Sequence, residues 1–274
     1  NMFSTLKVGR VRYGLMLRED GHVMDDGTTA RLGESHYVMT TTTAAAGEVM
    51  KHLDFVQQCL RPDLNVRFIS VTEQWAVATL SGPAAKEILS AAGTDINLND
   101  EGFGFMSMRE GYVSGLPARI YRISFTGELS YEINVPARYG MALWTTLMRA
   151  GKNFGITPYG TEAMHVLRGE KGFIIVGQET DGTVTPHDLA MSWIVSDKKP
   201  DFIGKRALAR HSMKAGDRKQ LVGLKTKDPK QVIPEGAHAT LDPDQPPPVE
   251  MLGHVTSSYF SPNLGHSVAM ALLR

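Results

Sequence analysis

The sequence predicts an α+β protein made of a large mixed part and a small β-rich part. Alternating apolar and polar residues predict strands, helical spacing predicts helices between them, and their order is not the strict βαβ alternation of a doubly wound sheet. Towards the end of the chain the predicted strands are short and prolines are frequent, which favours a small β domain. We therefore expect a first domain over residues 1–196, a connecting helix over 197–215 and a β-barrel domain over 216–274.

The first elements form a predicted hairpin. A strand runs from about Gly9 to Arg18, where apolar and polar side chains alternate. Glu19-Asp20-Gly21 is a turn signal, and a second alternating run extends from His22 to Leu32. The acidic pair Asp25-Asp26 lies inside this second strand.

The later elements are predicted by the same rules. Helices show apolar residues on one face and end near proline or glycine, and strands are short apolar runs between turn residues. In chain order we expect a strand over Tyr37–Thr41, a helix over Ala44–Leu60, strands over Val66–Thr72 and Trp75–Ser81, a helix from Pro83 to about Ala92, strands over Phe103–Arg109, Leu116–Ile123 and Tyr131–Val135, helices over Ala137–Ala150 and Gly160–Lys171, a polar loop over Gly177–Pro186, a strand near Ser192–Ser196, a helix from about Phe202 to Ser212, and strands over Gln220–Leu224 and Gly253–Tyr259.

Composition excludes several classes of protein. Of the 274 residues, 42% are hydrophobic and 21% are charged, which is typical of a globular protein and not of a disordered or fibrous one. The 29 basic residues balance the 29 acidic ones, so nucleic acid is not expected as a main partner. The single cysteine, Cys59, cannot form an internal disulfide and favours a reducing, cytoplasmic compartment. No apolar run predicts a membrane span or a signal peptide.

Asp25-Asp26 is the first candidate for a functional role. Adjacent side chains of a strand point to opposite faces, so one of the two acids is expected to face the interior or a cleft. A buried carboxylate costs several kcal/mol unless it is paired or protonated, and such a cost is often retained where a cation or a proton is handled. The plainer alternative is that the pair turns the chain together with Gly27.

A second candidate lies at Phe125-Thr126-Gly127-Glu128, followed by Tyr131-Glu132. A carboxylate beside an aromatic ring suits a flat heterocycle with an N–C–NH2 edge, because two donors meet two oxygens while the ring packs on a face. A hairpin turn with surface acids is the alternative.

Other chemistries have little support. The glycines between Gly169 and Gly182 follow a helix instead of preceding one, so they match neither phosphate-binding nor dinucleotide-binding loops, and an exposed connection is the better interpretation. No Cys/His cluster has metal-ligand spacing, no GxSxG elbow is present, and no metal is expected. His165, on a predicted helix, is expected to be a packed or surface residue.

Four segments together resemble the aminomethyltransferase (glycine-cleavage T protein) family. Tyr13 to Asp26, YGLMLREDGHVMDD, is similar to its aromatic strand, glycine turn and acidic pair, and Phe125 to Ile133, FTGELSYEI, to its GYTGE-x-GYE element. Asp201 to Leu208 and Gly253 to Leu272 resemble its interdomain helix and its C-terminal SP-x-LG signature. Within this superfamily, Thr161 to Arg206 is most similar to the α subunits of heterotetrameric sarcosine oxidases.

The resemblance implies an aminomethyltransferase-like domain, with ferredoxin-like antiparallel sheets and helices, that binds tetrahydrofolate in a central cleft. Asp26 matches the family's important aspartate near folate N5 and N10 and is the expected catalytic residue. Glu132 matches the glutamate that holds the pterin edge, and Tyr13 matches an aromatic residue lining the site. Met164 stands where the T protein has an arginine, so contacts to the folate tail do not carry over at that position.

The resemblance also implies an activity. Sarcosine would be oxidised at a flavin elsewhere in the complex, and the resulting imine would be captured here as 5,10-methylenetetrahydrofolate with release of glycine. FAD, FMN and NAD are expected in the full complex, with a flavin-bearing β subunit and smaller subunits as partners. The chain is expected to be truncated at both ends and not to be an oxidase by itself. A stand-alone folate-dependent aminomethyltransferase or demethylase and a non-catalytic folate-binding module stay open as alternatives.

Overall fold

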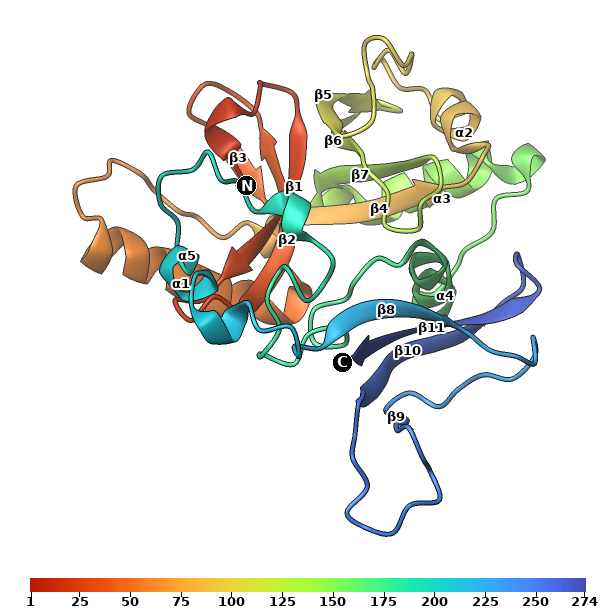
Figure 1. Cartoon of the computed structure of the whole chain (residues 1–274). Coiled ribbons are helices and arrows are strands. Elements are labelled where there is room, and N and C mark those ends of the chain that lie inside the picture. The colour runs from red at the N-terminus through yellow and green to blue at the C-terminus, as the bar shows by residue number, and fades with distance from the viewer. The chain divides into compact units, whose positions relative to one another are not determined.

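The computed structural model describes residues 1–274 and divides the chain into two compact units. We call them the first and the second unit. The first unit consists of Asn1–Met2, Gly14–Asp26 and Gly160–Arg274, and the second unit consists of Phe3–Tyr13 and Gly27–Tyr159. Helices and antiparallel sheets are mixed in the order that Figure 1 shows, which confirms the predicted α+β class. The predicted domain boundaries at residues 196 and 215 stay a prediction.

A four-stranded antiparallel sheet organises the second unit. Its strand order is β4-β7-β6-β5, and its bounds are Trp75–Ser81 (β4), Ser107–Val113 (β5), Leu116–Arg122 (β6) and Ser130–Pro136 (β7). One face packs on α2 (Ala85–Ala91) and α3 (Gly140–Ala150), and side chains such as Leu89, Ile133 and Leu143 have almost no exposed surface there. The alternation of each strand puts Glu132 on the opposite face, because its neighbours Tyr131 and Ile133 point into this core.

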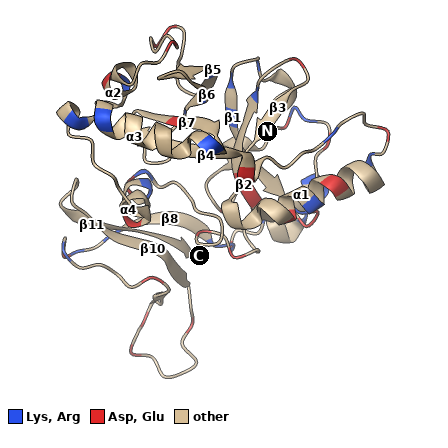
Figure 2. Cartoon of the chain, turned by 180° about the vertical axis from the view of Figure 1, so that it is seen from behind, with Lys and Arg blue, Asp and Glu red and all other residues tan.

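The N-terminal strands form a three-stranded sheet in the order β1-β2-β3, with bounds Val11–Leu17 (β1), Val23–Arg31 (β2) and Tyr37–Met39 (β3). The predicted hairpin is confirmed, and its turn contains Gly21 at φ +85°, the left-handed region that glycine enters at little cost. Helix α1 (Ala46–Phe55) follows and continues into a wider turn over Val56–Leu60. Acidic and basic residues are interspersed on α1, and β2 carries the acidic pair (Figure 2).

In the first unit, helix α4 (Thr161–Lys171) packs against a second four-stranded sheet. The strand order is β8-β11-β10-β9, with bounds Gln220–Lys225 (β8), His238–Ala239 (β9), Gly253–Ser261 (β10) and His266–Leu273 (β11). The turn between β10 and β11 is tied to α4, because Glu170 accepts hydrogen bonds from Ser261 at 2.5 Å and Asn263 at 3.3 Å. The Ser-Pro-Asn-Leu-Gly segment of this turn therefore has a structural role.

Four predicted elements are wrong or displaced. Val66–Thr72 forms no strand, because no neighbouring strand pairs with it and Ile69 is 76% exposed. The strand expected over Phe103–Arg109 begins only at Ser107, since Phe103 is a buried turn residue. Ser192–Ile194 is a 3-10 turn and not a strand. The helix expected over Phe202–Ser212 is limited to α5 (Lys205–Leu208), with a separate 3-10 turn at His211–Met213.

None of the helices is both long enough and apolar enough to cross a bilayer. Cys59 has a free thiol and is exposed.

Candidate functional site

The three residues predicted to bind a ligand lie on three different strands. Tyr13 is in β1 and Glu132 in β7, and both belong to the second unit. Asp26 is in β2 and belongs to the first unit. All three side chains are partly buried. Tyr13 and Glu132 therefore belong to one compact unit, the second, and Asp26 belongs to the first.

Glu132 lies between two dissimilar neighbours on the helix-free face of the sheet. Thr79 of β4 is directly opposite it on one side and Tyr121 of β6 on the other. Directly opposed side chains of antiparallel strands lie about 5 Å apart at Cβ. Thr79 is exposed, whereas Tyr121 is 6% exposed. The carboxylate therefore has a buried aromatic ring on one side and an open side over β4.

Burial alone perturbs the Glu132 carboxyl. It raises the pKa of Glu132 from 4.5 to about 6. No side-chain hydrogen bond or ion pair accompanies this burial, and outside the strand ladder Glu132 accepts one hydrogen bond at its backbone carbonyl, from the Asn134 amide at 3.4 Å. Burial also raises the pKa of the neighbouring Tyr121 to about 12, so its hydroxyl stays protonated at neutral pH. The Glu132 carboxylate thus has two acceptor oxygens to which no protein side chain donates a hydrogen bond.

Tyr13 shares a side of the second unit with Glu132. The segment before it is hydrogen-bonded to the start of β5, through Val11 N to Met106 O and Met108 N to Gly9 O, both at 2.9 Å. Val11 packs in a buried cluster with Met108 and Tyr121. Because side chains two apart on a strand point the same way, Tyr13 faces the side of Val11 and Tyr121, the side on which Glu132 also lies.

The acidic pair in β2 is divided between two environments. Asp25 has no exposed surface, whereas Asp26 is partly exposed. This confirms the prediction that one of the two acids faces the interior. The alternative interpretation, that the pair only turns the chain with Gly27, is wrong, because both acids and Gly27 lie within β2.

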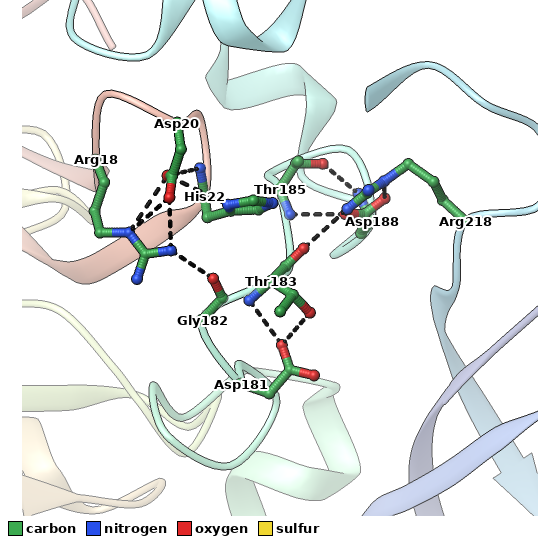
Figure 3. Close-up of polar contacts among 9 residues, drawn as sticks. All are labelled: Arg18, Asp20, His22, Asp181, Gly182, Thr183, Thr185, Asp188 and Arg218. Carbon is green, nitrogen blue, oxygen red and sulfur yellow. Dashed lines mark hydrogen bonds and ion pairs between the residues drawn. The ribbon is translucent and has the colours of Figure 1, made fainter. Parts of the chain in front are cut away.

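A polar network fixes the chain immediately before this pair (Figure 3). Arg18 donates to both carboxylate oxygens of Asp20, at 2.9 Å from Nη2 to Oδ2 and 3.3 Å from Nε to Oδ1. The backbone N–H of His22 donates to Asp20 at 3.0 Å. Burial opposes ionisation of Asp20, but the hydrogen bonds from Arg18 and His22 outweigh it and hold the pKa of this carboxyl well below its usual range.

The same network includes the loop that the sequence indicated as an exposed connection. Arg18 Nη2 donates to Gly182 O at 2.6 Å, and Arg218 Nη2 donates to Thr183 O at 2.9 Å. Asp188 is almost fully buried and receives the Arg218 guanidinium. The interpretation as an exposed connection is wrong for Glu179 and Thr180, which are buried, and the chain that follows is also buried at Val184, Thr185 and Asp188. No local signal could have identified the contacts of Arg18 with Gly182 and of Arg218 with Thr183 and Asp188, because these partners lie 164, 35 and 30 positions away.

No group of three His, Cys, Asp or Glu side chains is arranged to hold a metal ion. His165 lies on α4 and is partly buried, with its ring 6.4 Å from that of Tyr259. Met164, on the same helix, offers no charge to an anionic ligand.

Two families match the chain in order. The GCVT N-terminal domain covers residues 1–199, and the glycine cleavage T-protein C-terminal barrel domain covers residues 219–274. The chain belongs to the glycine-cleavage T-protein family. This confirms the resemblance and the expected fold.

Relatives of two kinds are similar over the whole chain. The sarcosine oxidase α subunits of Rhizobium meliloti (strain 1021) and Corynebacterium sp. (strain P-1) are 47% and 46% identical, and the chain spans 28% of each. The aminomethyltransferase of Halothermothrix orenii is 31% identical, and the chain spans 72% of it. Among solved structures, glycine cleavage system aminomethyltransferase T from Bartonella henselae aligns with a TM-score of 0.84 at 27% identity, over 98% of this chain and 69% of that one.

Proposed function

We propose that this T-protein family chain binds tetrahydrofolate and serves as the folate-dependent part of a sarcosine oxidase α subunit. The similarity to α subunits at 46–47% identity supports the assignment to this branch of the family. The observation that carries the ligand assignment is the Glu132 carboxylate, which is partly buried, has a raised pKa and makes no side-chain hydrogen bond or ion pair. Such a carboxylate is stabilised by a ligand that brings its own donors.

The pterin ring of folate fits this requirement. Its N–C–NH2 edge offers two parallel donors to the two oxygens of Glu132, and a paired, charge-assisted contact of this kind is stronger than a neutral one. Tyr13, on the same side of the second unit, supplies an aromatic surface for a flat ring. Glu132 and Tyr13 are therefore the proposed binding residues, together with Asp26.

Asp26 is the proposed catalytic residue. Bound tetrahydrofolate supplies two nitrogens, N5 and N10, that accept a one-carbon unit. An ionised Asp26 orients N10 and stabilises the positive charge of an iminium substrate, and an electrostatic contribution of this kind is large where water is excluded. Proton transfer at N10 is a second role open to the same carboxylate.

The proposed substrate is the imine that remains after sarcosine loses two electrons to a flavin. It is CH2=NH+–CH2–COO−, and its methylene carbon joins N5 and N10 of folate while its nitrogen leaves as glycine. The two protons released from N5 and N10 complete the ammonium group of glycine, so the transfer needs no further oxidant. We place the other cofactors in the whole complex and not in this chain: a flavin (FAD or FMN), NAD, and oxygen as the electron acceptor. The proposed partners are a flavin-bearing β subunit and smaller subunits.

The test compares Asp26→Ala with Asp63→Ala, an exposed aspartate paired with Arg61, in the assembled enzyme. We expect Asp26→Ala to reduce formation of 5,10-methylenetetrahydrofolate at least ~100-fold while flavin reduction by sarcosine continues, since loss of one oriented electrostatic contact costs on that order. Asp63→Ala should change neither. An unchanged folate product yield in Asp26→Ala would overturn the assignment.

A stand-alone aminomethyltransferase is the second candidate, favoured by the aminomethyltransferase T structure that aligns over 98% of the chain. This activity predicts transfer from an aminomethylated donor by the chain without flavin-bearing partners. Detection of that transfer, with loss in Asp26→Ala, would support the second candidate over the first.

A further inference from the structure

Three successive carbonyl groups in the loop of the first unit accept hydrogen bonds from three separate donors. Gly182 O accepts from Arg18 Nη2 at 2.6 Å and Thr183 O from Arg218 Nη2 at 2.9 Å (Figure 3). Val184 O accepts from the backbone N–H of Val23 at 2.9 Å. The third bond matters for function, because Val23 begins the strand that carries Asp25 and Asp26.

Arg218 holds this loop from the side of the C-terminal sheet. Its guanidinium makes paired contacts with Asp188, including Nε to Oδ1 at 2.9 Å, while Nη2 also reaches Thr183 O. Asp188 accepts a further bond from Thr185 N at 2.7 Å, and its backbone carbonyl accepts from Leu221 N of β8 at 2.7 Å. One arginine therefore joins the start of β8 to both ends of the 183–188 segment.

The packing around Val23 transmits this constraint. Val23 is 3% exposed and lies in one buried cluster with Val184, Leu189 and Leu272. Close-packed groups of this kind shift together because they leave no space for independent movement. A displacement of residues 183 and 184 therefore displaces the start of β2, and Asp26 follows three residues later.

The turn before β2 is fixed from the other side. Arg18 holds Asp20, and Gly204, at φ +89°, lies so close that an added Cβ would be 2.8 Å from Arg18 O. Gly21 packs against Leu208 in the same way, at 3.2 Å from an added Cβ. The turn before β2 therefore has little freedom to move. The position of the first residues of β2 then depends on the contact with Val184, which Arg218 holds in place through Thr183.

We propose that Arg218 is a positioning residue for Asp26, acting through Thr183, Val184 and the hydrogen bond to Val23. The inference rests on the proposed function of Asp26. It assigns to Arg218 a larger effect on turnover than on folate affinity, because two of the three proposed binding residues, Tyr13 and Glu132, belong to the second unit and do not depend on this loop contact.

The variant is Arg218→Lys, which keeps a positive charge near the buried Asp188 but cannot make the paired contact and reach Thr183 O together. The matched control is Arg122→Lys in the second unit. Arg122 also joins a carboxylate to a carbonyl, with Nη1 at 2.6 Å from Asp100 and 2.7 Å from Phe103 O, and its side chain is 16% exposed against 21% for Arg218. Both variants lose the same kind of contact.

Three measurements in the assembled enzyme decide the proposal. We expect Arg218→Lys to lower the turnover number for methylene-folate formation ~10-fold with a change of less than about threefold in KM for tetrahydrofolate, since a misplacement of about 1 Å costs up to ~100-fold. Amide exchange at Val23 should become ~10-fold faster in Arg218→Lys than in Arg122→Lys. Arg218→Lys combined with Asp26→Ala should be no slower than Asp26→Ala alone, because residues that act through one another are not additive.

The possible failures are distinguishable. If Asp26→Ala reduces turnover but Arg218→Lys leaves both turnover and Val23 exchange unchanged, the positioning role is overturned and the proposed function stands. Additive losses in the double variant, or equal losses in Arg122→Lys, would also overturn it, since they indicate a general effect on folding. If Asp26→Ala has no effect, the proposed function fails and the positioning role fails with it.

Discussion

The guanidinium of Arg168 and the carboxylate of Glu179 meet at 2.8 Å, and neither side chain has any exposed surface. Arg168 also donates to Phe173 O at 3.0 Å, Ser257 Oγ at 2.6 Å and Tyr259 Oη at 3.1 Å. The pair thereby connects α4, the segment that follows it and strand β10. Two charges without water around them are stable only while each has the other as partner.

Replacing Arg168 by Met is therefore expected to destabilise the first unit by about 3–5 kcal/mol, because Glu179 is left buried and uncompensated. Urea denaturation measures the loss. The double variant Arg168→Met with Glu179→Leu should recover part of it, since no isolated charge remains. Arg61→Met is the control, because the Arg61–Asp63 pair is exposed and water screens its charges, so its loss should change stability little. Equal losses for Arg61→Met and Arg168→Met would contradict the expectation.

Glu132→Gln is expected to stabilise the protein at neutral pH and to weaken folate binding. Below pH 4.5 the carboxyl is protonated in the folded and unfolded states. Because burial raises its folded pKa to about 6, the unfolded chain releases the proton first as the pH rises from 4.5 to 6, and stability falls over that window. Above it the cost is constant at about 2 kcal/mol, and Gln avoids it.

The measurement is the free energy of unfolding of both proteins at pH 4.5 and pH 7, together with calorimetric titration with a reduced-folate analogue. The difference in stability should be close to zero at the lower pH and favour Glu132→Gln at the higher. A constant difference at both values would show that Glu132 is not desolvated. Undiminished folate affinity in Glu132→Gln would exclude Glu132 as the pterin contact.

Asp20→Asn tests the turn before β2, and here we expect the opposite pH dependence to that of Glu132, with stability lost as the pH falls. The folded pKa of Asp20 lies below its ordinary value of 3.8, so its ionised form stabilises the folded state above that pH. The stabilisation is lost as the pH falls below 3.8. Because the side chain is 43% exposed, we expect a contribution below about 1 kcal/mol. The measurement is the free energy of unfolding of the parent protein and of Asp20→Asn at a series of acidic pH values. A difference in stability that grows at low pH would contradict the expectation.

Gly27→Ala is expected to destabilise β2 next to Asp26. An added Cβ would overlap the backbone carbonyl oxygen of Thr40, so the end of β3 must move away from β2. Overpacking of this kind costs about 1–3 kcal/mol or more. Gly47→Ala, in α1 with nothing within 4 Å of the added Cβ, is the control and should stabilise by up to about 1 kcal/mol. Thermal denaturation distinguishes them, and a neutral Gly27→Ala would show that the strands separate freely.

Local patterns in the sequence predicted most of the regular structure. The hairpin around Gly21, the helix α4 and the strands β8 and β10 agree with the expectations, because alternation and helical spacing depend on neighbours along the chain. Val66–Thr72 has the composition of a strand but no partner to pair with, and strand formation depends on such a partner.

The candidate site was predicted unevenly. Asp25 and Asp26 stood out because two acids interrupt an apolar alternation, and Glu132 stood out beside an aromatic residue. The sequence alone could not show that burial raises the Glu132 pKa, because the Tyr121 ring opposite it comes from another strand. Nor could it show which acid of the pair is fully buried.

By itself, then, the sequence determined the α+β class, most of the order of elements and the family, since these follow from patterns within short segments. Only the tertiary structure decided that Arg18 and Gly182, which are 164 positions apart, meet beside the strand of Asp26, and that Arg168 and Glu179 are buried together. The physical reason is that burial and charge pairing depend on residues distant in sequence, whose approach is set by packing of the whole unit.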